Sequence, residues 1–200
     1  MNLPNTLRSS IQTLLNTIGF GVLATENAGQ PHTSLIAITA LDEGQRLVFA
    51  TYRNTRKFTN LMQNQQVSVL MDGRSSAGAS GVPDGFVLSA VGRAQEINVN
   101  TRPDALAAHL QKHPDLAAFV QVPDCVLLEV LVQAYQVVRG IDDASWWCPQ
   151  DLKKGGPSLM KRPRGVTRGS STNCYFLYSY KCLSDKHCRL KRPIFWTNSA

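Results

Sequence analysis

The segment ATYRNTRKF, residues 50–58, carries the residue types best suited to hold a phosphate group. It leaves a predicted strand, bends, and enters a predicted helix at Thr55, Arg56 and Lys57. A helix start offers free N–H groups and a partial positive charge, and adjacent cations strengthen its attraction for an anion. Thr51 and Thr55 add hydroxyl donors. The segment therefore predicts a site for a phosphate monoester, with charge-assisted hydrogen bonds from Arg56 and Lys57. The alternative is a basic turn that faces solvent.

A second segment, GQPHTSLIAI at residues 29–38, begins polar and turns apolar. A strand of this kind can lay its backbone along a flat aromatic ring. Ser34 would then be a side-chain donor, and the backbone amides and carbonyls of Leu35, Ile36 and Ala37 could meet the polar edge of the ring. The alternative interpretation is an ordinary barrel strand.

A third segment, LMDGRSSAGAS at residues 70–80, leaves the end of another predicted strand. Its Arg74 and Ser75 could reach the same ligand, or a ligand bound mainly by a partner chain. The alternative is a flexible surface loop with one solvated arginine, because glycine and serine dominate the residues that follow.

Stronger catalytic signatures are absent from the sequence. There is no glycine-rich dinucleotide fingerprint, no Walker A loop, no H-E-x-x-H and no G-x-S-x-G. His109 and His113 lie four residues apart on a predicted helix and could share a metal ion. Because the surrounding sequence offers no third ligand, we expect a solvated helix face instead, with no metal bound.

The elements that must position these residues are mostly strands. Apolar periodicity and turn residues predict strands at 20–26, 31–41, 46–52, 66–72, 86–97 and 125–140, and helices at 4–18, 56–64 and 105–113. Short connections and the absence of a β-α-β rhythm favour a mainly β fold: a small six-stranded antiparallel barrel with peripheral helices.

The charge divides the chain into two parts. Residues 1–150 hold 10 Lys and Arg against 12 Asp and Glu, whereas residues 151–200 hold 11 Lys and Arg against two Asp. The basic pI of 9.4 therefore belongs to the last quarter and does not indicate that the body binds nucleic acid. No apolar run reaches the ~18–20 residues of a membrane-spanning helix, and the N-terminus lacks a secretory signal, so we expect a cytoplasmic protein without membrane partners.

The sequence predicts a first domain over residues 1–148 and a basic, Cys-containing tail over residues 149–200 that is irregular or a non-native extension. Two alternatives for the tail are a zinc site and single-stranded nucleic-acid binding by basic and aromatic residues. The zinc ligands would be Cys174, Cys182, His187 and Cys188.

The order of GQPHTSLIAI, LVFATYRNTRKFTNL, VSVLM and AVGRAQEI resembles the pyridoxamine 5'-phosphate oxidase-like, FMN-binding split-barrel superfamily over about residues 8–140. The resemblance implies a homodimer with FMN at its interface and two equivalent sites. Carried over by position, Ser34 to Thr39 would lie against the isoalloxazine and ribityl chain. Ala50 and Thr51 would follow at the end of the next strand, and Arg56 with Lys57 would hold the phosphate.

The sequence also departs from this family. In the oxidase itself, the strand matching residues 34–39 starts with an arginine and ends with a lysine that reaches the substrate phosphate, where this chain has Ser34 and Thr39. A glutamine that contacts the flavin falls at Val87. The resemblance therefore implies an FMN-dependent oxidoreductase for an unidentified small molecule rather than for vitamin B6, with NAD(P)H as a candidate electron donor. The alternative is a non-enzymatic flavin- or haem-binding carrier or sensor.

Overall fold

The computed structural model describes residues 3–74 and 85–153. Its helical elements are α1 (Asn5–Thr17), α2 (Arg56–Gln63), α3 (Pro103–Lys112) and α4 (Ala117–Val120), with 3₁₀ turns η1 (Asp42–Gly44), η3 (Pro114–Leu116) and η4 (Pro149–Leu152). Its strands are β1 (Phe20–Asn27), β2 (Gln30–Ala37), β3 (Thr39–Leu41), β4 (Arg46–Tyr52), β5 (Gln66–Asp72), β6 (Val87–Glu96), β7 (Cys125–Gly140) and β8 (Asp143–Trp147). None of the described helices is long and apolar enough to span a membrane.

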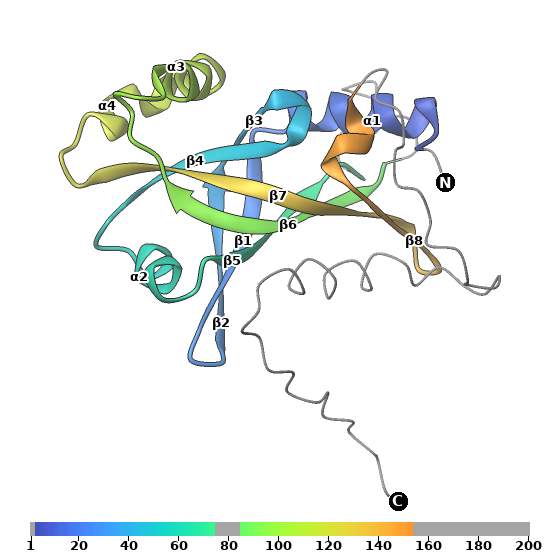
Figure 1. Ribbon diagram of the computed structural model, residues 1–200, viewed down its shortest axis with the longest axis horizontal. Helices are drawn as coiled ribbons and strands as arrows, with labels where there is room; N and C mark the ends of the chain where they lie inside the picture. Colours follow the sequence, from blue (N-terminus) through green and yellow to red (C-terminus); the bar gives the residue numbers. More distant parts are fainter. Residues whose placement is uncertain (1–2, 75–84, 154–200) are drawn as a thin grey trace, which may run out of the picture. The chain divides into compact units, whose positions relative to one another are not determined.

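The strands form one antiparallel sheet in the order β2-β1-β5-β6-β7-β4-β3, with β8 on β7 (Figure 1). The predicted mainly β fold with peripheral helices is confirmed. The described sheet has eight strands where the sequence predicted six. One extra strand, β8, follows a tight hairpin that the sequence interpretation overlooked. The other arises because the expected strand 31–41 is interrupted at Ile38 and divides into β2 and β3.

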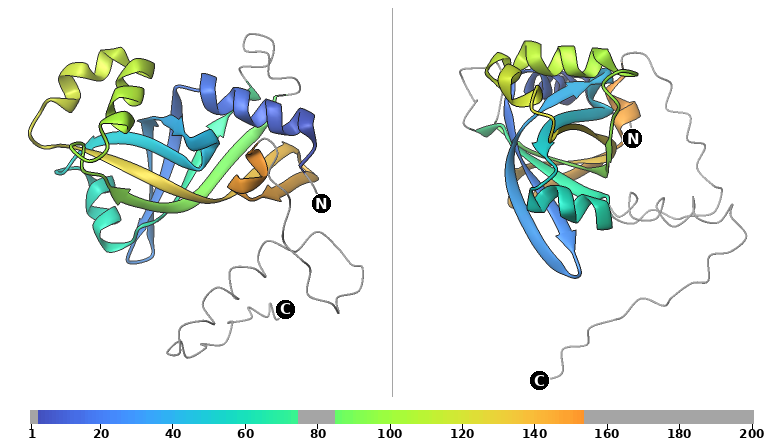
Figure 2. Two further views of the ribbon diagram at one scale, coloured as in Figure 1. Left: turned by 45° about the horizontal axis from the view of Figure 1, so that its top comes forward. Right: turned by 90° about the vertical axis from the view of Figure 1, so that its left-hand side faces the viewer.

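The interruption at Ile38 determines the shape of the sheet. β2 and β3 occupy its two ends, yet only Ile38 separates them in sequence, so the sheet has to curl until its two edges meet (Figure 2). The Ile38 N–H donates to the carbonyl of Gly19 (2.9 Å), and the Ile38 carbonyl accepts from His113 Nε2 (3.0 Å). Both backbone groups at the break are thus satisfied inside the protein, as buried backbone requires.

The core lies inside the curl and is covered at its openings by helices. The predicted apolar face of α1 is buried, with Ile11 and Leu14 fully inside. α2 packs on β1 and β2 through Phe58 and Leu61, whereas α3 packs outside the curl against β3 and β4. The buried residues of that outer layer are Val48, Ile97, Ala105 and Leu127.

Packing of the body extends as far as η4. Leu152 is fully buried in the main core, and α1 holds the turn in place. Arg8 Nε donates to the Asp151 carbonyl and Gln12 Nε2 to the Leu152 carbonyl, each at 2.9 Å. The tail residues 154–200, with the zinc and nucleic-acid alternatives that they carry, lie outside the described residues.

The long pair of β6 and β7 contains a β-bulge at Gly92. The register shifts between Val91 and Gly92, so that β7 carries one additional residue there. A Cβ atom at Gly92 would lie 2.2 Å from the Leu131 carbonyl oxygen, whereas one at Gly140 would have no atom within 4 Å. Of these two positions, only position 92 requires a glycine, because the backbone of β7 lies too close there for a side chain.

We therefore predict that Gly92→Ala lowers the free energy of unfolding by about 2 kcal/mol or more, because backbone must move to accept the methyl group. Gly140→Ala serves as the matched control and should change it by less than about 0.5 kcal/mol. Urea denaturation measures both. Equal effects of the two substitutions would show that the bulge does not need a glycine.

Candidate functional site

The corner between β4 and α2 is a chain of polar groups. Lys57 Nζ donates to Thr51 Oγ1 (3.5 Å), and the hydroxyls of Thr51 and Thr55 lie 3.1 Å apart. Thr55 gives its own proton to the Tyr52 carbonyl (2.8 Å), so Thr51 is the donor to Thr55. Thr55 also accepts from Phe58 N (3.4 Å), which makes it the N-cap of α2. The residue types of Asn54 and Thr55 before segment 56–64 predict a cap at this place. We call Thr51, Thr55, Arg56 and Lys57 the α2 corner.

The cations of the α2 corner have no carboxylate partner among the described residues. Lys57 is half-buried, and this burial lowers its pKa because the charged ammonium loses solvent. Arg56 is exposed and makes no hydrogen bond or ion pair within the described part of the chain. Its neighbour Arg53 pairs with Glu96 instead and lies over the Phe58 ring at 5.3 Å. The corner therefore presents two positive charges that no carboxylate of the described residues neutralises.

Buried polar contacts fix α2 against the edge of the sheet. Asn60 is buried, and its Nδ2 donates to Thr25 Oγ1 on β1 (3.0 Å). Thr25 in turn donates to the His32 carbonyl on β2 (3.3 Å). β2 also contacts β4, so the curl brings the predicted segments 29–38 and 50–58 together.

The residues of β2 alternate between its two faces. Ser34 and Ile36 face inward, and Ile36 belongs to the core, whereas Leu35 and Ala37 face outward. Ser34 Oγ lies 3.4 Å from His32 Nδ1. Among the described strands β2 pairs only with β1, so it has one free edge. Its backbone groups along that edge are available to a ligand. A strand that lies along a flat aromatic ring, as the sequence predicts for residues 29–38, requires such free backbone groups.

Two further predicted residues point their side chains elsewhere. Ala50 packs against the outer layer under α3, and Thr39 is buried there, with its Oγ1 3.0 Å from His109 Nδ1. Both could meet a ligand at the α2 corner only through their backbone atoms. Arg74 donates three hydrogen bonds to Asp72, two from its guanidinium and one from its backbone N–H, and these lower the pKa of Asp72 to about 2. Ser75 lies outside the described residues.

The predicted solvated face for His109 and His113 is wrong. Both rings are buried between α3 and the β2–β3 break, His109 completely. The sequence shows the i, i+4 spacing of the two histidines but not that their side of the helix is buried. The neighbouring alanines make every face of this segment weakly apolar, so no face stands out as the inward one. No group of three metal-ligating side chains occurs in residues 3–74 and 85–153.

A family model described as pyridoxamine 5'-phosphate oxidase matches residues 7–138. The chain belongs to this family. No curated protein matches it. Several solved structures share its fold at low identity. A haem-binding protein of Mycobacterium smegmatis has a TM-score of 0.63 at 19% identity and is aligned over 76% of this chain. The chain spans 61% of that protein's length.

Two other solved structures share the fold. A protein of Clostridium acetobutylicum related to general stress protein 26, described as of the pyridoxinephosphate oxidase family, has a TM-score of 0.59 at 12% identity. The match covers 76% of this chain and all of that one. The haem storage protein of Vibrio cholerae has a TM-score of 0.53 at 20% identity, covering 66% of this chain and 92% of its own.

In this member of the pyridoxamine 5'-phosphate oxidase family, sequence reasoning missed the polar support beneath the corner. The apolar residues of segment 56–64 predict Phe58, Leu61 and Met62 as the inward side of this helix. In the structure Met62 is 51% exposed, and Asn60 is buried on the inward face instead. One signal was present: Asn60 falls between the inward residues Phe58 and Leu61. A polar residue there is tolerated only if a partner meets it, and the partner, Thr25, comes from a strand 35 residues away.

The buried His109 predicts sensitivity to acid. Burial lowers its pKa from 6.5 to about 4, and the nearby charges of His113 and Lys112 act in the same direction. The unfolded chain binds this proton more readily than the folded chain, so His109 contributes stability that is present above pH 6.5 and lost as the pH falls toward 4. The loss should be about 3 kcal/mol.

Urea denaturation between pH 7 and pH 4 tests this contribution. His109→Gln should flatten the pH dependence relative to the wild type, and the matched control His32→Gln, on the exposed edge strand, should retain it. An unchanged slope in His109→Gln would mean that another group is responsible.

Proposed function

We propose that this chain binds FMN and acts as an oxidoreductase on an unidentified small molecule, with NAD(P)H as a candidate electron donor. The observation that carries the proposal is the unpaired charge of the α2 corner. A half-buried ammonium without a carboxylate is unfavourable in the folded protein, so its retention is explained best by a ligand anion. The first-turn N–H groups of α2 face the same corner and favour a phosphate there.

The donor set of the corner fits a phosphate monoester. Among residues 3–74 and 85–153, Lys57 has only the Thr51 hydroxyl as a partner, which leaves two ammonium hydrogens for phosphate oxygens. Arg56 can approach from solvent with its planar guanidinium, which suits bidentate contact with phosphate. Thr51 accepts from Lys57 and donates to Thr55, and Thr55 donates to the Tyr52 carbonyl. The two hydroxyls therefore support Lys57 and, in this arrangement, are not the phosphate donors that the sequence predicted.

Each part of the site has a separate task. FMN, when bound, supplies the hydride-transfer chemistry. Arg56 and Lys57 hold the phosphate, and the free backbone edge of β2 orients the ring, with Ser34 as a side-chain donor. Because the chemistry belongs to the cofactor, we assign no catalytic acid or base. The proposal accounts for the retained phosphate site and for the missing arginine and lysine at Ser34 and Thr39, which imply a substrate other than pyridoxamine phosphate.

We further propose that a second copy of the chain covers the outer face of β2, β1 and β5. Leu35, Val22 and Leu70 lie opposite one another across these three strands, and Leu35 and Leu70 are 70% and 42% exposed. Phe20 continues the patch at 57% exposure. Contiguous exposed apolar residues of this kind favour association. Since the patch includes β2, a homodimer would exclude water from the ring that β2 orients.

The second candidate function is a haem carrier or sensor on the same barrel. It is favoured by the fold similarity to the haem-binding protein of Mycobacterium smegmatis. The absorption spectrum of the purified protein distinguishes the two functions: flavin gives its visible bands, and haem gives a Soret band.

Substituting both cations of the corner should remove the phosphate contribution to cofactor affinity. We predict that Arg56→Ala with Lys57→Ala weakens FMN binding by about 100-fold or more, since each charge-assisted hydrogen bond contributes about 1.5–3 kcal/mol. Quenching of flavin fluorescence measures the affinity. Arg53→Ala is the matched control, because Arg53 pairs with Glu96, and it should leave the affinity within about threefold. Unchanged FMN affinity in the double variant would contradict the placement.

Charging the apolar face should prevent association. We predict that Leu35→Asp with Leu70→Asp yields a monomer that also binds FMN more weakly, because two buried carboxylates cannot be accommodated at the interface. Sedimentation equilibrium reports the oligomeric state. Ile141→Asp, at a fully exposed position on the β7–β8 hairpin, is the control and should remain dimeric. A double variant that still forms the wild-type dimer would place the interface elsewhere.

A further inference from the structure

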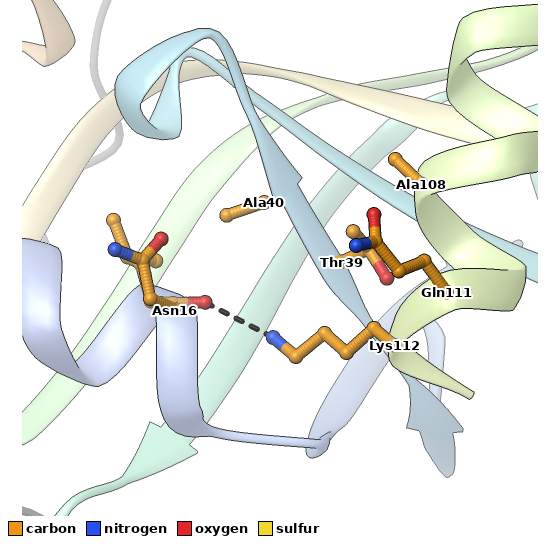
Figure 3. A pocket seen from close by; sticks show the side chains of 7 residues that line it. Asn16, Thr39, Ala40, Ala108, Gln111 and Lys112 are labelled. Atoms are coloured by element: carbon orange, nitrogen blue, oxygen red, sulfur yellow. Dashed lines mark hydrogen bonds between the residues drawn. The ribbon is translucent and has the colours of Figure 1, made fainter.

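A cavity of about 310 Å³, widely open to solvent, lies between α1 and α3, above β3 (Figure 3). Its polar lining comes from three elements: Asn16 at the end of α1, Thr39 on β3, and Gln111 with Lys112 at the end of α3. None of the residues of the α2 corner lines it. The cavity is therefore separate from the proposed phosphate site.

Lys112 is the charged group of this cavity. It is half-buried, and its Nζ donates to the Leu15 carbonyl at 3.1 Å, the dashed line in Figure 3. No carboxylate pairs with it in the described part of the chain. Burial consequently lowers its pKa to about 8. Two ammonium hydrogens remain for a ligand, and an anion would restore the lost stability of the charge.

Thr39 provides a second donor. Its Oγ1 lies 3.0 Å from His109 Nδ1, while His109 Nε2 is buried and meets no partner among the described residues. An unpaired N–H is harder to bury than an unpaired acceptor, so the favoured tautomer carries its proton on Nδ1. His109 then donates to Thr39, and the Thr39 hydroxyl keeps its own hydrogen for an acceptor in the cavity.

The rest of the lining is apolar and small. Leu15, Ala40 and Ala108 surround the polar groups and leave space for a short hydrocarbon body. The amide groups of Asn16 and Gln111 at the rim can donate to an oxygen. The cavity thus combines one cation, one hydroxyl donor and an apolar wall.

We propose that this cavity binds a small aliphatic carboxylate, with its carboxylate group on Lys112 and Thr39 and its hydrocarbon part against Leu15, Ala40 and Ala108. The volume accommodates a short monocarboxylic acid. The proposal does not rest on flavin binding, since none of the α2 corner residues lines the cavity.

Binding should depend on the protonation of Lys112. The ionisable groups near it on and after α3 are His109 and His113. α1 presents the Leu15 carbonyl and Asn16, and β3 presents Thr39, and these three groups carry no charge. Affinity is therefore highest below pH 8 and falls about tenfold for each pH unit above it. Binding near pH 8 takes up a proton.

Butyrate and its neutral isostere butyramide, titrated into the wild-type protein by calorimetry at pH 7, test the proposal. We expect butyrate to bind at least about tenfold more tightly than butyramide, and the difference to vanish in Lys112→Met. Ala108→Leu, which fills the cavity but keeps the charge, should also abolish butyrate binding. Lys57→Met should retain butyrate binding but bind FMN more weakly, whereas Lys112→Met should retain FMN binding but lose butyrate binding.

Three results would overturn the proposal. The first is equal binding of butyrate and butyramide, or no butyrate binding at all. The second is butyrate affinity that survives Lys112→Met or does not fall between pH 8 and pH 10. The third is butyrate binding that survives Ala108→Leu, which would place the carboxylate outside the cavity. None of these outcomes depends on whether FMN binds.

Discussion

The structure depends on a single connectivity constraint: one extended segment provides both edges of the sheet. β2 and β3 are separated only by Ile38, whose N–H and carbonyl are held by Gly19 and by His113. The sheet must curl to accommodate this, and the curl sets the end of β4 beside β2. The α2 corner and the free edge of β2 become neighbours for that reason, although 16 residues lie between Ser34 and Thr51 in the sequence.

Much of this arrangement was predictable because it is local. Period-two apolar patterns gave the strand positions, and the Thr55 N-cap followed from residue type alone. The division at Ile38 was not predictable, because the local pattern of residues 31–41 is continuous and the break depends on a distant histidine. The burial of His109 and the role of Asn60 depend on partners 70 and 35 residues away, which periodicity cannot reveal.

Two sets of cations among the described residues differ in their partners. Arg46, Arg53, Arg74, Arg102 and Arg139 all pair with carboxylates. Lys57 and Lys112 are half-buried, have lowered pKa values, and meet only a hydroxyl and a carbonyl. Folding leaves these two ammonium groups partly desolvated without a counter-charge, which is typical of groups that await a ligand rather than of groups that stabilise the fold.

The central claim is that the α2 corner recognises the phosphate of a flavin nucleotide. The most direct measurement compares the dissociation constants of FMN and riboflavin for the wild-type protein, because the two ligands differ only by the phosphate. The account predicts that FMN binds about 100-fold or more tightly, and that high salt weakens FMN alone. Equal affinities for the two ligands would contradict it.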